Sequence, residues 1–169
     1  MRVGTKSLLF GAHQFILHPV FVTAAWWKIY HELPDWKVLT CIIVHDWGYW
    51  GSPNMDGAEG KNHPYRGASF ARKLFGHTYY ELILYHSRFT ARAYGAPQSK
   101  LCFADKIGIA LTPAWIWVFG SVLSGEWKEY RAQNQRDYTD KFDCSSPWKF
   151  IRDYKLLSKK WLADGVVTL

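Results

Sequence analysis

The sequence predicts an all-α protein with a single domain, on three observations. The chain has 169 residues, of which 49% are hydrophobic, and this is enough for one substantial core. Its apolar runs have helical spacing and end at Gly or Pro, whereas strand-like alternation is weak throughout. No linker, repeat or low-complexity tract divides the chain. We therefore expect residues 1–169 to form one helical bundle.

The first half of the chain contains clear start and stop signals for helices. Pro19 suits the first residue of a helix that runs toward Tyr30. Asp35 is a candidate N-cap for a second helix, which continues through Asp46 and stops at Gly48 and Gly51. Residues 51–62, GSPNMDGAEGKN, are rich in turn-forming residues and predict a loop.

Two further helices are predicted between this loop and residue 95. Residues 63–76, HPYRGASFARKLFG, predict a short helix closed by Gly76. Residues 78–95 predict one longer helix, with Thr78 as a plausible cap and Gly95 as its end.

The last part of the chain predicts helices as far as about Ala163. Ser99 is a candidate cap for a helix that breaks at Pro113. Residues 113–133 predict one or two helices, and Ser145 or Ser146 caps a last helix from Pro147. No motif after about Gly120 indicates a function.

The charge of the chain favours anionic partners of small size. The net charge is +7, with a pI near 9.3. Surplus Lys and Arg can simply solubilise the surface, or they can attract nucleotides and phosphate esters. Because the basic residues are dispersed, the sequence does not indicate a dedicated nucleic-acid site.

Cysteine usage and hydropathy predict a cytoplasmic protein. The three cysteines are widely spaced, match no zinc-finger pattern and follow no signal peptide. Residues 7–27 and 107–125 carry no Asp, Glu, Lys or Arg, but the first stretch contains His13, His18 and Pro19, and the second contains Thr112 and Pro113. We expect buried helices there rather than membrane spans. A homodimer through exposed Trp side chains stays open.

A series of His and Asp residues at helix ends and in apolar segments indicates a metal site. Imidazole nitrogen suits borderline transition metals, and a carboxylate can bridge two of them. A single His in a helical protein is usually structural, so it is the whole set that points to metal chemistry. The members are His18, His45, Asp46, His63, His86 and Asp105.

The order of these residues resembles the HD-domain superfamily of metal-dependent phosphohydrolases, in its dinuclear form. The similarity extends from about Gly11 to Ile109 and involves five segments. They are LHPVFVTAAWW, IIVHDWGYWG, HPYRGASFARKL, ILYHSR and LCFADKIGIA. His13 is an alternative to His18 as the first ligand, but the residues after His18 match the family better. Trp47 departs from the small or aliphatic residue that often follows His-Asp.

The resemblance implies an HD-type helical bundle that holds one or two divalent ions of Mn, Fe, Co, Ni or Zn. It implies hydrolysis of a phosphoester or phosphoanhydride by a metal-activated water, with Asp46 bridging the ions and orienting the water. Arg88 and Lys106 are the candidate catalytic countercharges for phosphate.

The remaining substrate contacts are predicted from position. Arg66 lies three residues after His63, on roughly the same helix face, and Lys61 lies in the glycine-rich loop. Tyr49 and Trp50 could stack on a base, so the expected substrate is a small phosphorylated compound such as a nucleotide.

Two other functions remain open on the same ligands. Some HD-fold proteins hold two irons with this set and oxygenate a small substrate, for example a phosphonate or a polyol. A non-catalytic module that binds a metal or a nucleotide is the third alternative. Dependence on dioxygen separates the first of these from a hydrolase.

Overall fold

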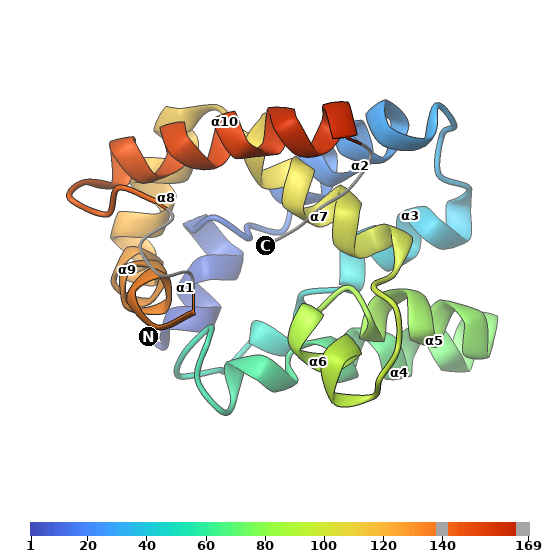
Figure 1. The fold of residues 1–169 in the computed structure, drawn as a ribbon. Helices are drawn as coiled ribbons and strands as arrows, with labels where there is room; N and C mark the ends of the chain where they lie inside the picture. Colours follow the sequence, from blue (N-terminus) through green and yellow to red (C-terminus); the bar gives the residue numbers. More distant parts are fainter. Residues whose placement is uncertain (138–141, 165–169) are drawn as a thin grey trace.

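The structure is a computed structural model that describes residues 1–137 and 142–164. Within these ranges helices pack into one all-helical domain without strands, which confirms the predicted fold class (Figure 1). The helices are α1 (Val3–Phe10), α2 (Leu17–Tyr30), α3 (Trp36–Val44), η1 (Trp47–Tyr49), η2 (Gly60–Asn62), α4 (Pro64–Phe75), α5 (His77–Leu84), α6 (Arg88–Ala93), α7 (Lys100–Leu111), α8 (Ala114–Ser124), α9 (Glu126–Asp137) and α10 (Pro147–Asp164).

Side-chain caps start several helices where the sequence predicts them. Asp35 Oδ1 accepts hydrogen bonds from the backbone N–H groups of Lys37 and Val38, at 2.9 and 2.8 Å. Ser99 Oγ accepts one from the N–H of Cys102, and Ser146 Oγ caps α10 in the same way. Such caps satisfy N–H groups that have no partner inside the helix. The helix that Asp35 starts ends at Val44, two residues before the predicted end.

The prediction of one helix over residues 78–95 is wrong. The structure has two helices there, α5 and α6, separated by a turn at residues 85–87. Ser87 is extended, with φ −78° and ψ 118°, and its hydroxyl accepts a hydrogen bond from the N–H of Thr90. A capping serine inside the apolar run therefore ends one helix and starts another. The turn places His86 at a corner of the chain.

Two other segments, α1 and the residues after Pro113, refine the predicted layout. No bounds were predicted for α1, which overlaps only the first residues of the uncharged stretch 7–27, where buried helices were expected. Residues 113–133, predicted as one or two helices, form two, because Gly125 adopts φ +92° between them. This left-handed conformation suits glycine and ends α8.

The core is built around α2 and α7, with α10 packed against α7 and α8 (Figure 1). Val22, Ala25, Leu101 and Ile107 are fully buried between these helices. Lys155 on α10 donates hydrogen bonds to the carbonyl oxygens of Ala110 and Thr112, at 2.5 and 2.6 Å. These contacts satisfy carbonyl groups at the end of α7 and hold α10 in place.

Two glycines allow the segment around His45 to meet the start of α4. A Cβ atom on Gly48 would collide with the backbone of His63, and one on Gly67 would collide with the carbonyl oxygen of Val44. Only glycine permits backbones to approach this closely. The His-Asp dipeptide and His63 therefore lie side by side.

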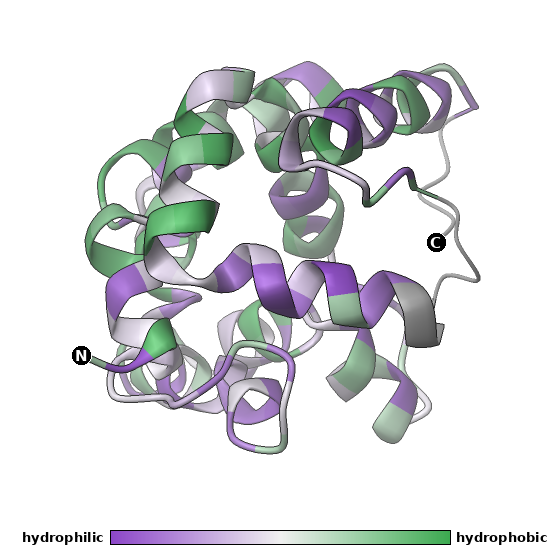
Figure 2. Ribbon diagram, turned by 90° about the vertical axis from the view of Figure 1, so that its left-hand side faces the viewer, coloured by the Kyte–Doolittle hydropathy of each residue, from purple (hydrophilic) through white to green (hydrophobic). Residues whose placement is uncertain are grey.

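Helix α8 is strongly hydrophobic and leads into the hydrophilic α9 (Figure 2). Trp115, Phe119 and Leu123 expose 60%, 60% and 66% of their surface. Within the described residues no single helix is long and apolar enough to cross a membrane. Helices α7 and α8 reach that length only together, and they are bent by 102°.

Candidate metal centre

The structure brings the six candidate ligands together in the interior. Each comes from a different position in the fold. His18 lies at the start of α2, and His45 and Asp46 directly follow α3. His63 is the N-cap of α4, His86 lies in the turn before α6, and Asp105 lies in the middle of α7. All six side chains are buried. The exposed fractions are 2% for His18, 1% for His45, 5% for Asp46, 8% for His63, 2% for His86 and 4% for Asp105.

The ligand atoms form two groups that share Asp46. On one side, Asp46 Oδ2 lies 3.2 Å from His45 Nε2 and 3.5 Å from His18 Nε2. On the other side, Asp46 Oδ1 lies 3.6 Å from the Nε2 atoms of His63 and His86. Each group of three could hold a metal ion. Asp46 is therefore placed to bridge two ions.

Asp105 completes the first group. Its Oδ1 lies 3.1 Å from His18 Nε2 and 3.8 Å from His45 Nε2. Its other oxygen, Oδ2, accepts a hydrogen bond from Lys106 Nζ at 2.6 Å. Lys106 therefore fixes the orientation of the carboxylate and leaves Oδ1 facing the histidines.

Backbone carbonyls set the tautomers of three histidines. The Nδ1 atoms of His45, His63 and His86 lie 2.7, 2.7 and 2.5 Å from the carbonyl oxygens of residues three positions earlier. A carbonyl oxygen only accepts, so each Nδ1 carries the proton and donates it. Each Nε2 therefore presents a lone pair to the cluster, as metal binding requires.

The arrangement fits divalent metal ions. Ligands about 2.1 Å from an ion lie roughly 3–3.5 Å from one another, and the cluster distances fall close to this range. The facing Nε2 atoms of His63 and His86 are 3.1 Å apart, and their lone pairs repel unless a cation separates them. Buried Asp46 Oδ2 and Asp105 Oδ1 make no hydrogen bond in the described structure. Nitrogen and oxygen donors of this kind suit transition metals.

The charges in the cluster shift the pKa values strongly. Burial would raise the pKa of the Asp46 carboxyl, but the charge of His45 and the close approach of His86 hold it well below its usual value. Burial would lower the pKa of His45, but Asp46 and Asp105 raise it to about 10. Burial and the charge of His86 lower the pKa of His63 to about 3. Metal ions therefore compete with protons for these nitrogens.

A cavity of about 740 Å³ opens beside the cluster. Asp46, His63, His86 and Asp105 line one part of it. Arg88 and Lys106, the predicted countercharges, also line the cavity, and so does Lys61. Tyr49 reaches it as well, with its ring stacked on His63 at a centroid distance of 4.1 Å.

Two predicted substrate contacts lie outside the cavity lining. Arg66 is exposed on α4, whose buried face consists of Pro64, Gly67, Ala68 and Ala71. His63 has helical dihedral angles, but the buried face extends from it toward Gly67 and Ala71, four and eight residues later, and Arg66 lies on the exposed side. Trp50 is half-exposed and stacks on Phe15. Trp47 packs against Phe70 and serves the core rather than the cavity.

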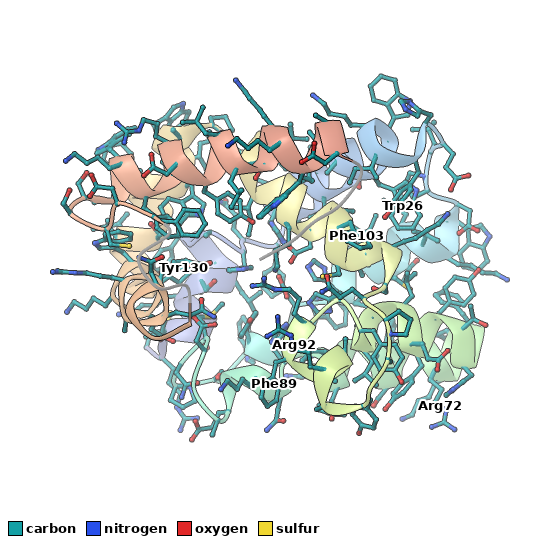
Figure 3. All side chains as sticks on the ribbon, in the orientation of Figure 1. Trp26, Arg72, Phe89, Arg92, Phe103 and Tyr130 are labelled. Atoms are coloured by element: carbon teal, nitrogen blue, oxygen red, sulfur yellow. The ribbon has the colours of Figure 1, made fainter. Side chains whose placement is uncertain are left out.

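The sequence analysis missed several residues that line the cavity. Arg92 enters it from α6, and Gln133 and the aromatic rings form its far wall. The rings are Trp117, Tyr130, Phe142, Phe150 and Tyr154. In Figure 3, Phe89 and Arg92 lie on the side of α6 that faces the region of Tyr130. Of these residues only Arg92 could have been predicted from the sequence, because it lies one helical turn after Arg88.

His13 has a role distinct from the ligand cluster. Its Nδ1 lies 2.9 Å from Oε2 of Glu126, a fully buried carboxylate 113 residues away. Burial would lower the pKa of His13, but Glu126 raises it to about 9. His13 and His18 were alternatives for the first ligand, and the structure puts His18 in the ligand group and His13 on Glu126.

Comparisons with known proteins do not extend this description. No protein-family model, curated protein or solved structure matches the chain. The buried His/Asp cluster is compatible with an HD-type site.

Adding Mn²⁺, Co²⁺, Ni²⁺ or Zn²⁺ should raise the melting temperature of the protein. An ion present at about 100 times its Kd stabilises the folded state by about 2.7 kcal/mol, which is roughly 5–10 °C for a chain of this size. Differential scanning fluorimetry with each ion measures the shift, and EDTA should reverse it. A melting temperature that no ion changes would count against the metal centre.

Proposed function

We propose that the protein is a metal-dependent phosphohydrolase that cleaves a phosphoester or phosphoanhydride bond of a small substrate. One observation carries the proposal: Asp46 is shared by two buried ligand groups next to a cavity lined by Arg88 and Lys106. A bridged pair of ions beside an anion-binding cavity suits phosphoryl transfer.

The chain would hold two ions at defined residues. His18, His45 and Asp105 would hold one, His63 and His86 the other, and Asp46 both. When bound, the ions would activate a water and offset the charge of the phosphoryl group. Lys106 keeps Asp105 in position through its hydrogen bond to Oδ2. Burial would lower the pKa of Lys106, but the charge of Asp105 raises this pKa above its usual value.

Arg88 supplies the substrate-facing charge in this proposal. It lies within electrostatic range of Lys106 and immediately follows the turn that carries His86. A guanidinium group there can pair with phosphate oxygens and offset the charge that develops during attack. The aromatic wall opposite α6 can take an apolar or planar part of the substrate, which suits a nucleotide.

A screen of phosphorylated metabolites tests the proposal. The protein is incubated with Mn²⁺, Fe²⁺, Co²⁺, Ni²⁺ or Zn²⁺, with and without dioxygen, and free phosphate and products are measured. A phosphohydrolase releases phosphate under anaerobic conditions. Turnover that needs iron and dioxygen would instead assign the oxygenase alternative. Metal binding without turnover of any compound would assign a binding module.

Replacing Arg88 by glutamine should lower kcat/KM by about 10²–10³-fold, because the transition state loses a cation. Arg66→Gln is the matched control, since Arg66 is an exposed arginine outside the cavity lining. Steady-state kinetics on the best substrate from the screen measures both variants. Equal activity of the two variants would contradict the assignment of Arg88.

A further inference from the structure

The cations of the cavity fall into an inner and an outer pair. Lys106 donates a hydrogen bond to Asp105, and Arg88 is close enough to Lys106 for their charges to interact. These two cations, the inner pair, therefore lie next to the ligand cluster. Arg92 and Lys61 also line the cavity, but both side chains are exposed, which places them toward its mouth. The inner pair suffices for the scissile phosphoryl group, and the outer pair has no part in that proposal.

The outer pair consists of cations without carboxylate partners. Within the described part of the chain, neither Arg92 nor Lys61 forms an ion pair. Lys61 Nζ lies 4.8 Å from the centre of the Phe89 ring, which fixes the lysine beside α6. Figure 3 shows Phe89 and Arg92 close together on this helix. Two cations from η2 and α6 therefore converge on one side of the mouth.

Spacing along α6 separates the outer pair from the inner one. Arg92 follows Arg88 by four residues, which is one helical turn, so their Cβ atoms lie about 6 Å apart on the same face. A phosphoryl group held at Arg88 would leave Arg92 within reach of another group on the same small substrate.

The positive charge of the side chains that line the cavity favours a ligand with more than one anionic group. Among the described residues that line it, Lys61, Arg88, Arg92 and Lys106 stand against three carboxylates, of which Asp46 and Asp105 belong to the ligand cluster. Two divalent ions would more than neutralise those two. A single phosphate ester would leave a surplus of positive charge at the mouth, where a second anion can be bound.

We propose that Arg92 and Lys61 bind a second anionic group of the substrate, a phosphate or a carboxylate, one helical turn or more from the scissile phosphoryl group. The substrate class is then a phosphoester that carries two separated anions, rather than a simple monophosphate. This inference rests on the proposed function for the identity of the first group.

Binding of phosphonates tests the second subsite without turnover. Alkylphosphonates carry one anion, whereas α,ω-alkylenebisphosphonates and ω-phosphonoalkanoates of increasing length carry two. Calorimetry on the protein as purified should show about tenfold tighter binding of a two-anion compound of suitable length. The bisphosphonate and carboxylate series show which second anion the site prefers.

Variants assign the preference to the outer pair. Arg92→Gln and Lys61→Gln should each reduce the two-anion preference by about threefold or more, whereas affinity for the alkylphosphonate stays unchanged. Arg72→Gln is the matched control, an exposed arginine on α4 that lies over Tyr80, far from Arg92 in Figure 3. Equal affinity for one-anion and two-anion compounds, no binding of either, or a preference that survives both substitutions overturns the proposal.

The experiments distinguish a failure of the hydrolase proposal from a failure of the second-subsite proposal. If the screen finds no release of phosphate but Arg92 still determines a two-anion preference, the hydrolase proposal fails and the subsite stands. If phosphate is released from simple monophosphates as fast as from two-anion substrates, and Arg92→Gln changes neither rate, the hydrolase stands and the second subsite is wrong.

Discussion

Asp46→Asn should empty both ion positions and reduce metal-dependent turnover by at least about 10³-fold. Asparagine keeps the volume of the side chain but removes the charge and one of the two oxygens. Since Oδ1 faces His63 and His86 while Oδ2 faces His18 and His45, one group then faces an NH2 group and the other keeps only an uncharged carbonyl oxygen, so the anionic bridge between the two positions is lost. Elemental analysis of the purified variant and phosphate release with added metal measure the two effects.

Asp105→Asn provides the comparison that makes this prediction specific. Of the histidines in the cluster, Asp105 lies near His18 and His45, so its loss should weaken their ion position and leave the other. Calorimetric titration should then show one binding event retained, against none in Asp46→Asn. Circular dichroism should show unchanged helix content in both variants. Two ions per chain and full activity in Asp46→Asn would refute the bridging assignment.

Local signals explain why much of the helical layout and the ligand set could be predicted. Asp35 and Ser99 act within three residues of themselves, so their capping role can be recognised in the sequence. The order of the His and Asp residues likewise needs no tertiary information. The need for glycine at positions 48 and 67 could not be predicted in this way, because the close backbone contacts that require it form only when α4 packs against the end of α3.

Predictions that needed a helix face or a distant partner were less successful. Arg66 was assigned from its spacing to His63, yet the buried face of α4 extends from His63 toward Gly67 and leaves Arg66 exposed. Arg92 lies one turn after Arg88 whether or not the helix breaks at Ser87, but only the packing of α6 beside the cavity shows that both side chains line it. The cavity wall from α9 and α10 depends on how α9 packs against α8 and α10 against α7 and α8, which no local pattern encodes.

The largest predicted effect on stability concerns Glu126. This carboxylate is fully buried and accepts hydrogen bonds from the N–H of Ala12 at 2.9 Å, Ser124 Oγ at 2.8 Å and His13 Nδ1 at 2.9 Å. Glu126→Ala leaves these three donors without their acceptor and removes the partner of a buried histidine. We expect the free energy of unfolding to fall by about 3–5 kcal/mol, which lowers the melting temperature by roughly 6–20 °C.

Denaturant unfolding followed by circular dichroism measures the loss. The matched control is Glu32→Ala, which removes an exposed carboxylate from its ion pair with Lys100 and should leave the melting temperature nearly unchanged. A loss in Glu126→Ala no larger than in this control would show that the buried pair contributes little.

A double-mutant cycle with His13→Phe separates the pair from the other bonds of Glu126. If the histidine left without its carboxylate causes most of the loss, His13→Phe should recover part of the stability in the Glu126→Ala background, since phenylalanine needs no polar partner. If the unpaired groups of Ala12 and Ser124 dominate, the two substitutions should add. Because His13 lines the cavity without belonging to a ligand group, the metal content should stay the same in every variant of the cycle.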